Sequence, residues 1–477
     1  MAINYIKITE VELFSKTNID PVGLLFVYKE KFYRAINDAA IDDILYLFDS
    51  GAIKELNDLN LIPDTKISDL KLEGFNLVLE HERIEIITYS AEWSFEMLKA
   101  AAKLVIEVNK VLFKYGFETK DAHYNNILFD KYIPKFVDIG SFHRRKNNKY
   151  WECKDEYYRS FVYPLKIWAS GNSQLARRSI SDPSSLLLRY EFTLYKHPIL
   201  RAIPKSIIVK ISYLLEVLRN LSKFDLDNIL IVHNPKLKRK ILKILHKISQ
   251  YGFLPNNNIN LNRLERVIER IKRPLYATKW GDYHFKVNKD ELFKAGGRFD
   301  LIINLIKEYK INEVFEVGGN QGMLSIELVK FIDKVICSDY DEVAVDSMYI
   351  NLFNTNSKIT PVLLDIMHPI YLNNPFIEKS KPQVRLKSQA TLVLAVTHHL
   401  ILEQKKSIDE IFEAVLQYTK EYLFIEFMPN GIDKNPVPDW YKFEWFKEHF
   451  EKYLDVLLIK TSTEDGSRIL FLGRVKN

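Results

Sequence analysis

The chain has 477 residues, which is too long for one hydrophobic core and predicts two or three domains. Its 47% hydrophobic and 27% charged residues describe a globular protein able to bury large cores. The net charge of +6 is small for this length, so we expect no nucleic acid among its partners.

Other features of the sequence indicate a cytoplasmic protein. No apolar run reaches the roughly 18 residues of a membrane span. The first residues lack the basic-then-apolar layout of a signal peptide. The only two cysteines, Cys153 and Cys337, are not in a spacing typical of metal sites or redox motifs, which agrees with a reduced compartment.

The first part of the chain predicts a small β-rich unit that leads into a long helix. This order resembles a protein-kinase-like N-lobe entering its C-lobe. The expected elements are a hairpin at residues 22–36 turning near Lys29–Lys31, a helix at 41–56, two strands at 76–89 about a turn at 80–83, and a long helix capped by Ser90 and stopped at Gly116.

Two polar motifs follow this helix. Asn126 lies five residues after Asp121, and Asp138 ends the apolar strand that follows. Phosphotransferases need one carboxylate to orient the attacking hydroxyl, and an amide and a carboxylate to hold Mg²⁺ against the phosphates of ATP. The motifs resemble the catalytic and metal loops of aminoglycoside-phosphotransferase-like kinases. The resemblance implies Asp121 as the catalytic residue and Asn126 and Asp138 as metal ligands.

This part of the chain departs from the kinase pattern in two respects. It has no glycine-rich loop to cover the phosphates. The strand position of the phosphate-binding lysine holds Arg34 instead, and arginine does not simply replace lysine at such a site. Both an active kinase and a kinase-like scaffold without phosphotransfer therefore fit these residues.

The sequence predicts three domains, with the last boundary near Pro274. Residues 1–165 are expected to form a kinase-like α+β domain, residues 166–274 a mostly helical extension, and residues 275–477 an α/β domain. Within the extension, Pro235–Lys247 predicts a basic amphipathic helix. It fits a solvated face or a peripheral contact with an anionic membrane surface.

Strands and helices alternate in the last domain, which predicts a parallel sheet with helices on both faces. Its end differs, because the strands around Glu464–Ser467 predict an antiparallel hairpin. Class I methyltransferases end in this way, and dehydrogenases usually do not. The expected strands are 314–317, 334–338, 360–364, 391–396, 422–427, 454–460 and 468–475, and the expected helices are 299–309, 324–331, 342–353 and 408–419.

The carboxyl ends of the first three strands predict a ligand site. Glu316, Asp339 and Asp365 stand at these ends, where open α/β sheets bind ligands. Asp339 is spaced to accept both ribose hydroxyls, and Asp365 is placed to accept from an adenine amino group. Glu316 suits the ammonium of an amino-acid group.

A glycine-rich turn follows Glu316, and its sequence limits the class of ligand that we expect. It lacks the GxGxxG spacing, which favours a mononucleoside ligand over a dinucleotide. The turn and the three acids together resemble the S-adenosylmethionine site of class I methyltransferases, with Asn320 in place of the usual middle glycine. The resemblance implies S-adenosyl-L-methionine as cofactor. Its expected contacts in the turn are Gly318, Gly319, Asn320 and Gly322.

Methyl transfer to oxygen also needs a base for the proton of the acceptor. His398 and His399 follow the fourth strand, and imidazole titrates near neutral pH. We favour His399 as the base, although either histidine also fits a packing role at the start of a helix. Glu426, at the end of the fifth strand, is the second choice as a base or as a ligand for the acceptor hydroxyl.

Over residues 75–477 the chain resembles a bacterial family of nodulation-protein-like methyltransferases tied to surface-glycan gene sets. The resemblance implies O-methylation of a glycan or related polar acceptor, with the kinase-like domain binding the acceptor or regulating. Enzymes that cap O-antigen chains are a more distant resemblance, which implies the alternative of a bifunctional kinase–methyltransferase. The segment Met367–Gln389 departs from the family. The matching motifs are Glu92–Leu98, Lys120–Ala122, Val137–Phe142, Glu316–Gly322, Thr397–Leu400 and Glu426–Pro429.

Overall fold

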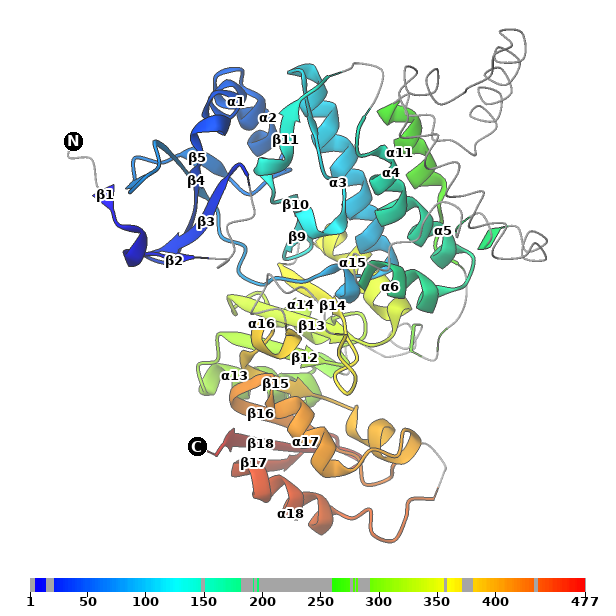
Figure 1. Cartoon of the computed structure of the whole chain (residues 1–477). Coiled ribbons are helices and arrows are strands. Elements are labelled where there is room, and N and C mark those ends of the chain that lie inside the picture. Colours follow the sequence, from blue (N-terminus) through cyan, green and yellow to red (C-terminus); the bar gives the residue numbers. More distant parts are fainter. Residues whose placement is uncertain are drawn as a thin grey trace, which may run out of the picture.

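The structure is a computed structural model, and Figure 1 shows its arrangement. It describes residues 5–13, 21–146, 151–181, 192, 195–196, 260–274, 278, 280–281, 292–355, 358–370, 381–432 and 436–476.

The N-terminal region begins with a five-stranded antiparallel sheet in the order β2-β3-β4-β7-β5. The predicted hairpin is confirmed, because its two strands turn at Lys29 and Glu30, which both have positive φ. The strands are β2 (Glu12–Leu13), β3 (Gly23–Tyr28), β4 (Lys31–Ile36), β5 (Thr65–Ile67) and β7 (Leu77–His81). A separate parallel pair joins β1 (Tyr5–Ile6) to β6 (Lys71–Leu72).

Two predictions in this region are wrong. The expected single helix is two, α1 (Asp38–Asp49) and α2 (Ala52–Asp58), because Gly51 takes a left-handed conformation with φ 85°. The expected second strand after residue 83 is absent from residues 84–89, and β7 pairs instead with β4 and the upstream β5.

The long helix is α3 (Phe95–Lys114), and it is the central helix of this half of the molecule (Figure 1). Its predicted cap is wrong by four residues: Ser90 begins a short 3-10 turn, and Ser94 precedes the helix. Its predicted stop is confirmed, because Gly116 follows with φ 77°. Apolar side chains are buried over most of the helix surface, which is typical of a helix packed on several sides.

Two short antiparallel strand pairs and several helices follow α3. The strands β8 (Phe117–Thr119) and β11 (Phe142–Arg144) pair, as do β9 (Ile127–Asp130) and β10 (Ile133–Phe136). The described helices after them are α4 (Lys154–Tyr157), a π-helical turn (Tyr158–Val162), α5 (Tyr163–Ala169), α6 (Ser173–Ser181) and α11 (Leu261–Arg270), as a mostly helical region predicts.

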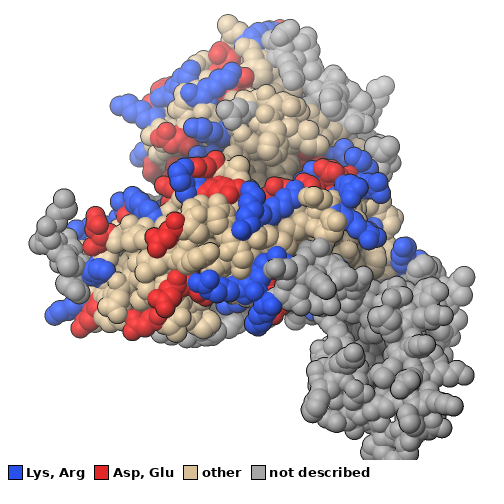
Figure 2. All heavy atoms as spheres, turned by 90° about the horizontal axis from the view of Figure 1, so that it is seen from above, with Lys and Arg blue, Asp and Glu red and all other residues tan. Residues whose placement is uncertain are grey.

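The predicted basic helix at residues 235–247 lies outside the described residues, so its membrane contact stays a prediction. In the ranges that the structure does describe, every helix is too short or too polar to cross a bilayer. On the face shown in Figure 2, basic and acidic side chains are intermixed over the described residues.

A seven-stranded sheet organises the C-terminal region, in the order β14-β13-β12-β15-β16-β18-β17. The first five of these strands are parallel, and β18 runs antiparallel to both of its neighbours. The α/β fold with a reversed terminal hairpin is therefore confirmed. The strands are β12 (Glu313–Val317), β13 (Lys334–Asp339), β14 (Ile359–Leu363), β15 (Ser388–Val393), β16 (Thr419–Phe427), β17 (Leu454–Thr461) and β18 (Ile469–Val475).

Helices cover both faces of this sheet. Val314 and Phe315, neighbours in β12, belong to two different hydrophobic cores, because successive side chains of a strand point to opposite faces. One core contains α13 (Arg298–Glu308), α14 (Met323–Leu328) and α15 (Glu342–Thr355). The other contains α17 (Ile408–Leu416) and α18 (Phe443–Tyr453). The sheet is thus doubly wound.

The two halves of the chain share the first of these cores, since α15 packs against α3. Polar contacts add to the junction. The backbone N–H of Glu96 donates to Oδ1 of buried Asp346 at 2.9 Å. Arg385, in the short α16 (Pro382–Arg385), donates to both carboxylate oxygens of Glu92 at 2.5 and 3.1 Å. Both Arg385 and Glu92 side chains are more than nine-tenths buried.

Candidate active site

A cavity of about 450 Å³ opens at the carboxyl ends of the parallel strands. This volume is within the range of small-molecule sites in proteins. Of the residues predicted to contact the cofactor, six line it: Glu316, Gly318, Gly319, Asn320, Asp339 and Asp365. His398 and His399 line it too, whereas Gly322 and Glu426 do not.

The glycine turn between β12 and α14 forms the floor of the cavity. Gly318, Asn320 and Gly322 have φ values of 67°, 54° and 73°, so Asn320 takes the left-handed conformation expected of it. At Gly319, a Cβ atom would lie 2.3 Å from Sγ of Cys337, which leaves room only for glycine. Gly322 does not contact the cavity, and it starts α14 instead.

Asp339 joins this turn to the end of β13. Its Oδ2 accepts from the backbone N–H of Asn320 at 2.9 Å, and its Oδ1 accepts from the N–H of Asp341 at 2.8 Å. Burial raises the pKa of Asp339 to about 7, although both N–H donors oppose that shift. A carboxylate with donors on one side and a cavity on the other is suited to accept hydroxyl donors from a ligand.

The other two acids differ in their surroundings. Glu316 is buried, and its Oε2 accepts from the Ser325 hydroxyl at 2.5 Å; burial raises the pKa of Glu316. Asp365 is half-exposed at the rim, where its Oδ1 accepts from the N–H of Met367 at 2.9 Å and its Oδ2 pairs with His368 at 3.2 Å. Asp365 therefore lies at the outer end of the cavity, and Glu316 at the inner end.

The histidine pair follows β15 on the wall facing the turn. The ring centroids of His398 and His399 are 4.0 Å apart. His398 is buried with an unpartnered Nδ1, and burial lowers its pKa to about 3. Nδ1 of His399 pairs with Oε2 of Glu403 at 2.9 Å, and both residues line the cavity. His399 is thus the histidine with an orienting carboxylate.

Trp280 contacts both His399 and the glycine turn. Its ring meets His399 edge-on at 4.5 Å, and its Nε1 donates to the Tyr340 hydroxyl at 2.8 Å. The carbonyl of Trp280 accepts from Nδ2 of Asn320 at 2.8 Å. The segment before the sheet is therefore part of the cavity wall, which a reading based on strand ends alone does not find.

Glu426 is fully buried and does not line the cavity. Its two carboxylate oxygens accept from Nε and Nη2 of Arg298 at 2.7 and 2.6 Å, and Arg468 lies 3.5 Å away. Although burial alone raises the pKa of Glu426, the two guanidinium groups outweigh it and lower the pKa. Both arginines line the cavity. Arg298, Arg468 and Glu403 are not among the residues predicted from the sequence. The four-residue spacing of His399 and Glu403, which places them on one face of a helix turn, could have indicated Glu403.

The predicted phosphotransfer residues lie in the N-terminal region. Pairing of β9 with β10 brings Asn126 beside Val137, whose N–H donates to the Asn126 carbonyl at 2.9 Å. Val137 is the residue before Asp138. Nη2 of Arg34 lies 3.3 Å from Oδ1 of Asp138. Asp121 belongs to a group with His123 and Glu156, whose possible metal-ligand atoms lie within 4.8 Å of one another.

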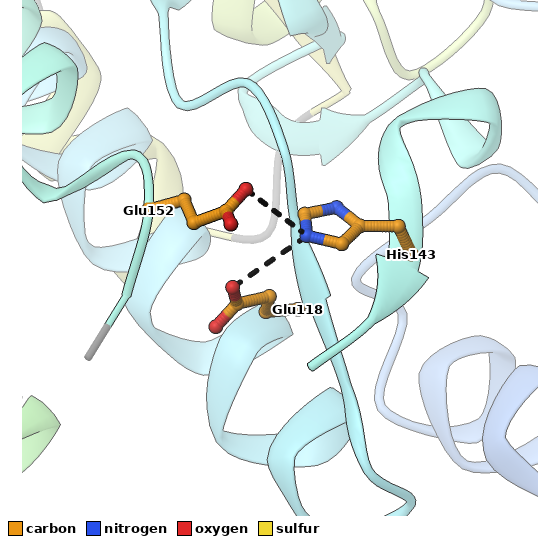
Figure 3. Close-up of side chains that lie close together, drawn as sticks. All are labelled: Glu118, His143 and Glu152. Carbon is orange, nitrogen blue, oxygen red and sulfur yellow. Dashed lines mark ion pairs between the residues drawn. The ribbon is translucent and has the colours of Figure 1, made fainter. Parts of the chain in front are cut away.

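A second group of this kind surrounds His143, on β11 (Figure 3). Its Nε2 lies 3.5 Å from Glu118 and 3.6 Å from Glu152. Both carboxylates also have a basic partner, because Arg145 lies 3.3 Å from Glu118 and Lys146 lies 3.2 Å from Glu152. The group is therefore a network of ion pairs beside the paired strands β8 and β11.

No family model matches the chain. The chain is 23% identical to the nodulation protein NoeA of Rhizobium meliloti (strain 1021) over 433 residues, which are 86% of this chain and 83% of the relative. The chain is also similar to many solved structures, two of them at 12% identity. One is magnesium protoporphyrin IX methyltransferase of Synechocystis PCC 6803 with bound SAM, which covers 49% of this chain and 96% of its own with a TM-score of 0.31. The other is an S-adenosylmethionine-dependent methyltransferase of Clostridium acetobutylicum ATCC 824, which covers 45% of this chain and 99% of its own with a TM-score of 0.30.

Proposed function

We propose that the chain is an S-adenosylmethionine-dependent methyltransferase that O-methylates a glycan or related polar acceptor. One observation supports this most: three acids from three adjacent parallel strands and a glycine turn line one cavity, in the order that the two ends of the methyl donor require. Asp365 is at the rim, Asp339 is at the turn, and Glu316 is at the inner end.

The residues present fit this donor. Gly318 and Gly319 line the cavity without a side chain of their own, so a ligand can approach the backbone of the turn closely. Asp339 would accept the ribose hydroxyls, Asp365 the adenine amino group, and Glu316 would pair with the ammonium. When bound, S-adenosylmethionine supplies an electrophilic methyl group on its sulfonium sulfur.

In this proposal, one of the two histidines that line the cavity accepts the proton of the acceptor hydroxyl. Oxygen methylation requires the acceptor hydroxyl to lose its proton, and a nearby base assists that step. Glu403 on Nδ1 of His399 leaves Nε2 as the nitrogen that takes the proton. Burial lowers the pKa of His398 to about 3, which makes it a poor base at neutral pH. Glu426 is held by Arg298 on both oxygens, which supports a structural role for it rather than proton uptake.

The test is calorimetric titration with S-adenosylhomocysteine. We expect binding to the wild type and a loss of at least tenfold in Asp339→Ala. Asp333→Ala is the matched control, because Asp333 is exposed at the opposite end of the same strand. Equal binding by wild type and Asp339→Ala would remove the donor site from this cavity. Mass spectrometry of candidate glycans after incubation with labelled donor then identifies the acceptor.

A bifunctional kinase–methyltransferase is the second candidate. Two observations favour it: Arg34 pairs with Asp138, and the backbone of Asn126 is bonded to Val137, the residue before Asp138. An arginine, an amide and a carboxylate together would fit ATP phosphates with Mg²⁺. In this reading Asp121 orients the attacking hydroxyl. Thermal stabilisation by Mg²⁺-ATP that disappears in Asp138→Ala would support it. If the wild type shows no such stabilisation, the kinase-like domain binds or presents the acceptor without phosphotransfer.

A further inference from the structure

Glu118, His143 and Glu152 bring three side chains to one point from three segments of the N-terminal region (Figure 3). Glu118 lies on β8 and His143 on β11, and the paired strands place these two residues directly opposite each other. Glu152 comes from the segment that leads into α4. Each of the three residues offers one nitrogen or oxygen atom, and these atoms lie within 4.8 Å of one another.

The distances within this group are too long for hydrogen bonds. Nε2 of His143 lies 3.5 Å from Oε1 of Glu118 and 3.6 Å from Oε2 of Glu152, whereas a hydrogen bond from nitrogen to oxygen measures about 2.7–3.2 Å. Both ring nitrogens of His143 are buried, and neither makes a hydrogen bond within the described part of the chain. Buried nitrogens usually have such a partner, so this imidazole calls for another explanation.

The same distances match two ligands of one zinc ion. Bonds from zinc to imidazole nitrogen and to carboxylate oxygen are about 2.0–2.2 Å long and point to the corners of a tetrahedron. Two ligand atoms of one such ion are therefore about 3.3–3.6 Å apart. The distances of 3.5 and 3.6 Å from His143 to the two carboxylates agree with this separation.

The basic partners of the two carboxylates bind the oxygens that face away from the histidine. Arg145 donates to Oε2 of Glu118 at 3.3 Å, while Oε1 is the oxygen near His143. Lys146 donates to Oε1 of Glu152 at 3.2 Å, while Oε2 is the oxygen near His143. Carboxylates that bind metals are commonly oriented by such outer hydrogen bonds. The ion pairs are therefore compatible with a cation between the three side chains.

The buried thiol of Cys153 shows which charges act in these surroundings. Burial is the largest cause of its raised pKa, followed by the negative charge of four carboxylates: Glu156, Asp121, Glu118 and Glu152. Such a field favours a cation. The thiol itself donates to the carbonyl of Thr119 at 2.8 Å, so Cys153 is not one of the ligands.

We propose that Glu118, His143 and Glu152 bind a divalent cation of the zinc type. Imidazole suits zinc and similar transition metals, whereas Mg²⁺ takes oxygen ligands in octahedral geometry. Three protein ligands leave the fourth corner of the tetrahedron for water, and the half-exposed Glu152 gives solvent access to that side. The cation would tie β8 and β11 to the start of α4. This site depends neither on the proposed methyl donor nor on the Mg²⁺ of the phosphotransfer candidate.

The test is equilibrium dialysis of the full chain against ZnCl₂ after treatment with a chelator, with bound zinc measured by atomic absorption. We expect the wild type to bind Zn²⁺ tightly and to retain it in excess Mg²⁺. The key variant is Glu152→Gln, because Glu152 is half-exposed and glutamine has the same shape. Its affinity for Zn²⁺ should fall about tenfold or more, since even the outer partners of metal ligands have effects of this size.

Glu107→Gln is the matched control. Glu107 is similarly exposed and also pairs with a lysine, Lys110, at 2.7 Å. His143→Gln removes the central ligand, and His123→Gln tests the neighbouring group around Asp121. We expect the loss of zinc in His143→Gln but not in Glu107→Gln or His123→Gln. Circular dichroism establishes folding, and Glu152→Gln decides the matter if His143→Gln does not fold.

The site is overturned if the wild type takes up no Zn²⁺. It is also overturned if Glu152→Gln and His143→Gln bind Zn²⁺ as the wild type does, which would mean adventitious binding only. Loss of zinc in His123→Gln alone would place the metal in the neighbouring group instead. Displacement of the bound Zn²⁺ by Mg²⁺ would contradict a site of the zinc type.

Discussion

The backbone N–H of Asn320 donates to Oδ2 of Asp339, so one carboxylate holds the left-handed residue of the glycine turn and also lines the cavity. The pKa of Asp339, about 7, makes the proposed binding of the methyl donor depend on pH. Ribose hydroxyls donate to the charged carboxylate and favour it. We expect the affinity for S-adenosylhomocysteine to rise as pH increases from 5.5 to 8.5. Titration calorimetry at several pH values measures this, and an equally steep rise in Asp339→Asn would assign the dependence to another group.

Alanine substitutions at Gly318 and Gly466 separate the effect of a steric collision near the glycine turn from the effect of backbone strain. Their φ values are 67° and 70°, so alanine is strained similarly at both. A Cβ at Gly318 would lie 2.5 Å from Cγ2 of Val396, whereas at Gly466 it meets nothing within 4 Å. We expect Gly318→Ala to lower the free energy of unfolding by about 1–3 kcal/mol more than Gly466→Ala. Denaturant unfolding provides the comparison, and equal losses would mean that Val396 moves aside without cost.

Asp346 makes the stability of the junction between the halves depend on pH. Burial raises its pKa from 3.8 to about 7, so the folded state holds its proton more tightly than the unfolded chain. Its contribution to stability is fully present below about pH 4 and is lost as pH rises through about 7. In Asp346→Asn the side chain is neutral throughout. Between these pH values, the free energy of unfolding of the variant should therefore rise by up to about 4 kcal/mol relative to that of the wild type. Urea unfolding at pH 4.5 and 7.5 checks the sign, and a constant difference would contradict it.

Glu403 is expected to act on methyl transfer through His399. Replacing it with glutamine keeps a hydrogen-bonding partner for Nδ1 but removes the charge that favours a protonated ring. We expect kcat for methyl transfer to fall about 10- to 100-fold and the rising limb of its pH profile to move to lower pH. Binding of S-adenosylhomocysteine should not change.

Glu413→Gln is the control for this variant, because Glu413 is exposed on α17. The measurement uses labelled methyl donor and the glycan identified by mass spectrometry. A pH profile of Glu403→Gln that coincides with the wild type would leave Glu403 with a purely structural role.

The C-terminal fold follows closely from the order of residues along the chain. Apolar strands alternate with amphipathic helices, and this local pattern is sufficient to predict the doubly wound sheet and its terminal hairpin. The acids are predictable for the same reason, because a parallel sheet brings its strand ends to one edge. That Glu316, Asp339 and Asp365 line one cavity is a consequence of topology.

The remainder depends on contacts between residues that are distant in sequence. Glu426 occupies the expected strand end, but its partner Arg298 is 128 residues earlier and fixes its chemistry. Ser90 and Ser94 are equally good caps by residue type. In the fold, the N–H of Tyr89 donates to Glu92, and the Arg385 guanidinium binds the same carboxylate, so the chain continues in a short turn before α3. Such choices depend on tertiary partners.

The packing of α15 against α3 decides whether the two halves of the protein can be studied separately. Tyr349 and Phe353 of α15 contact Phe129 and Tyr132 of the β9–β10 hairpin, with ring centroids 6.1 and 5.0 Å apart. A fragment starting at residue 275 would expose this aromatic face to water and leave Asp346 without the N–H of Glu96. Removal of the N-terminal half therefore strips the seven-stranded sheet of part of its own core, and truncation is a poor way to assign separate activities to the two halves.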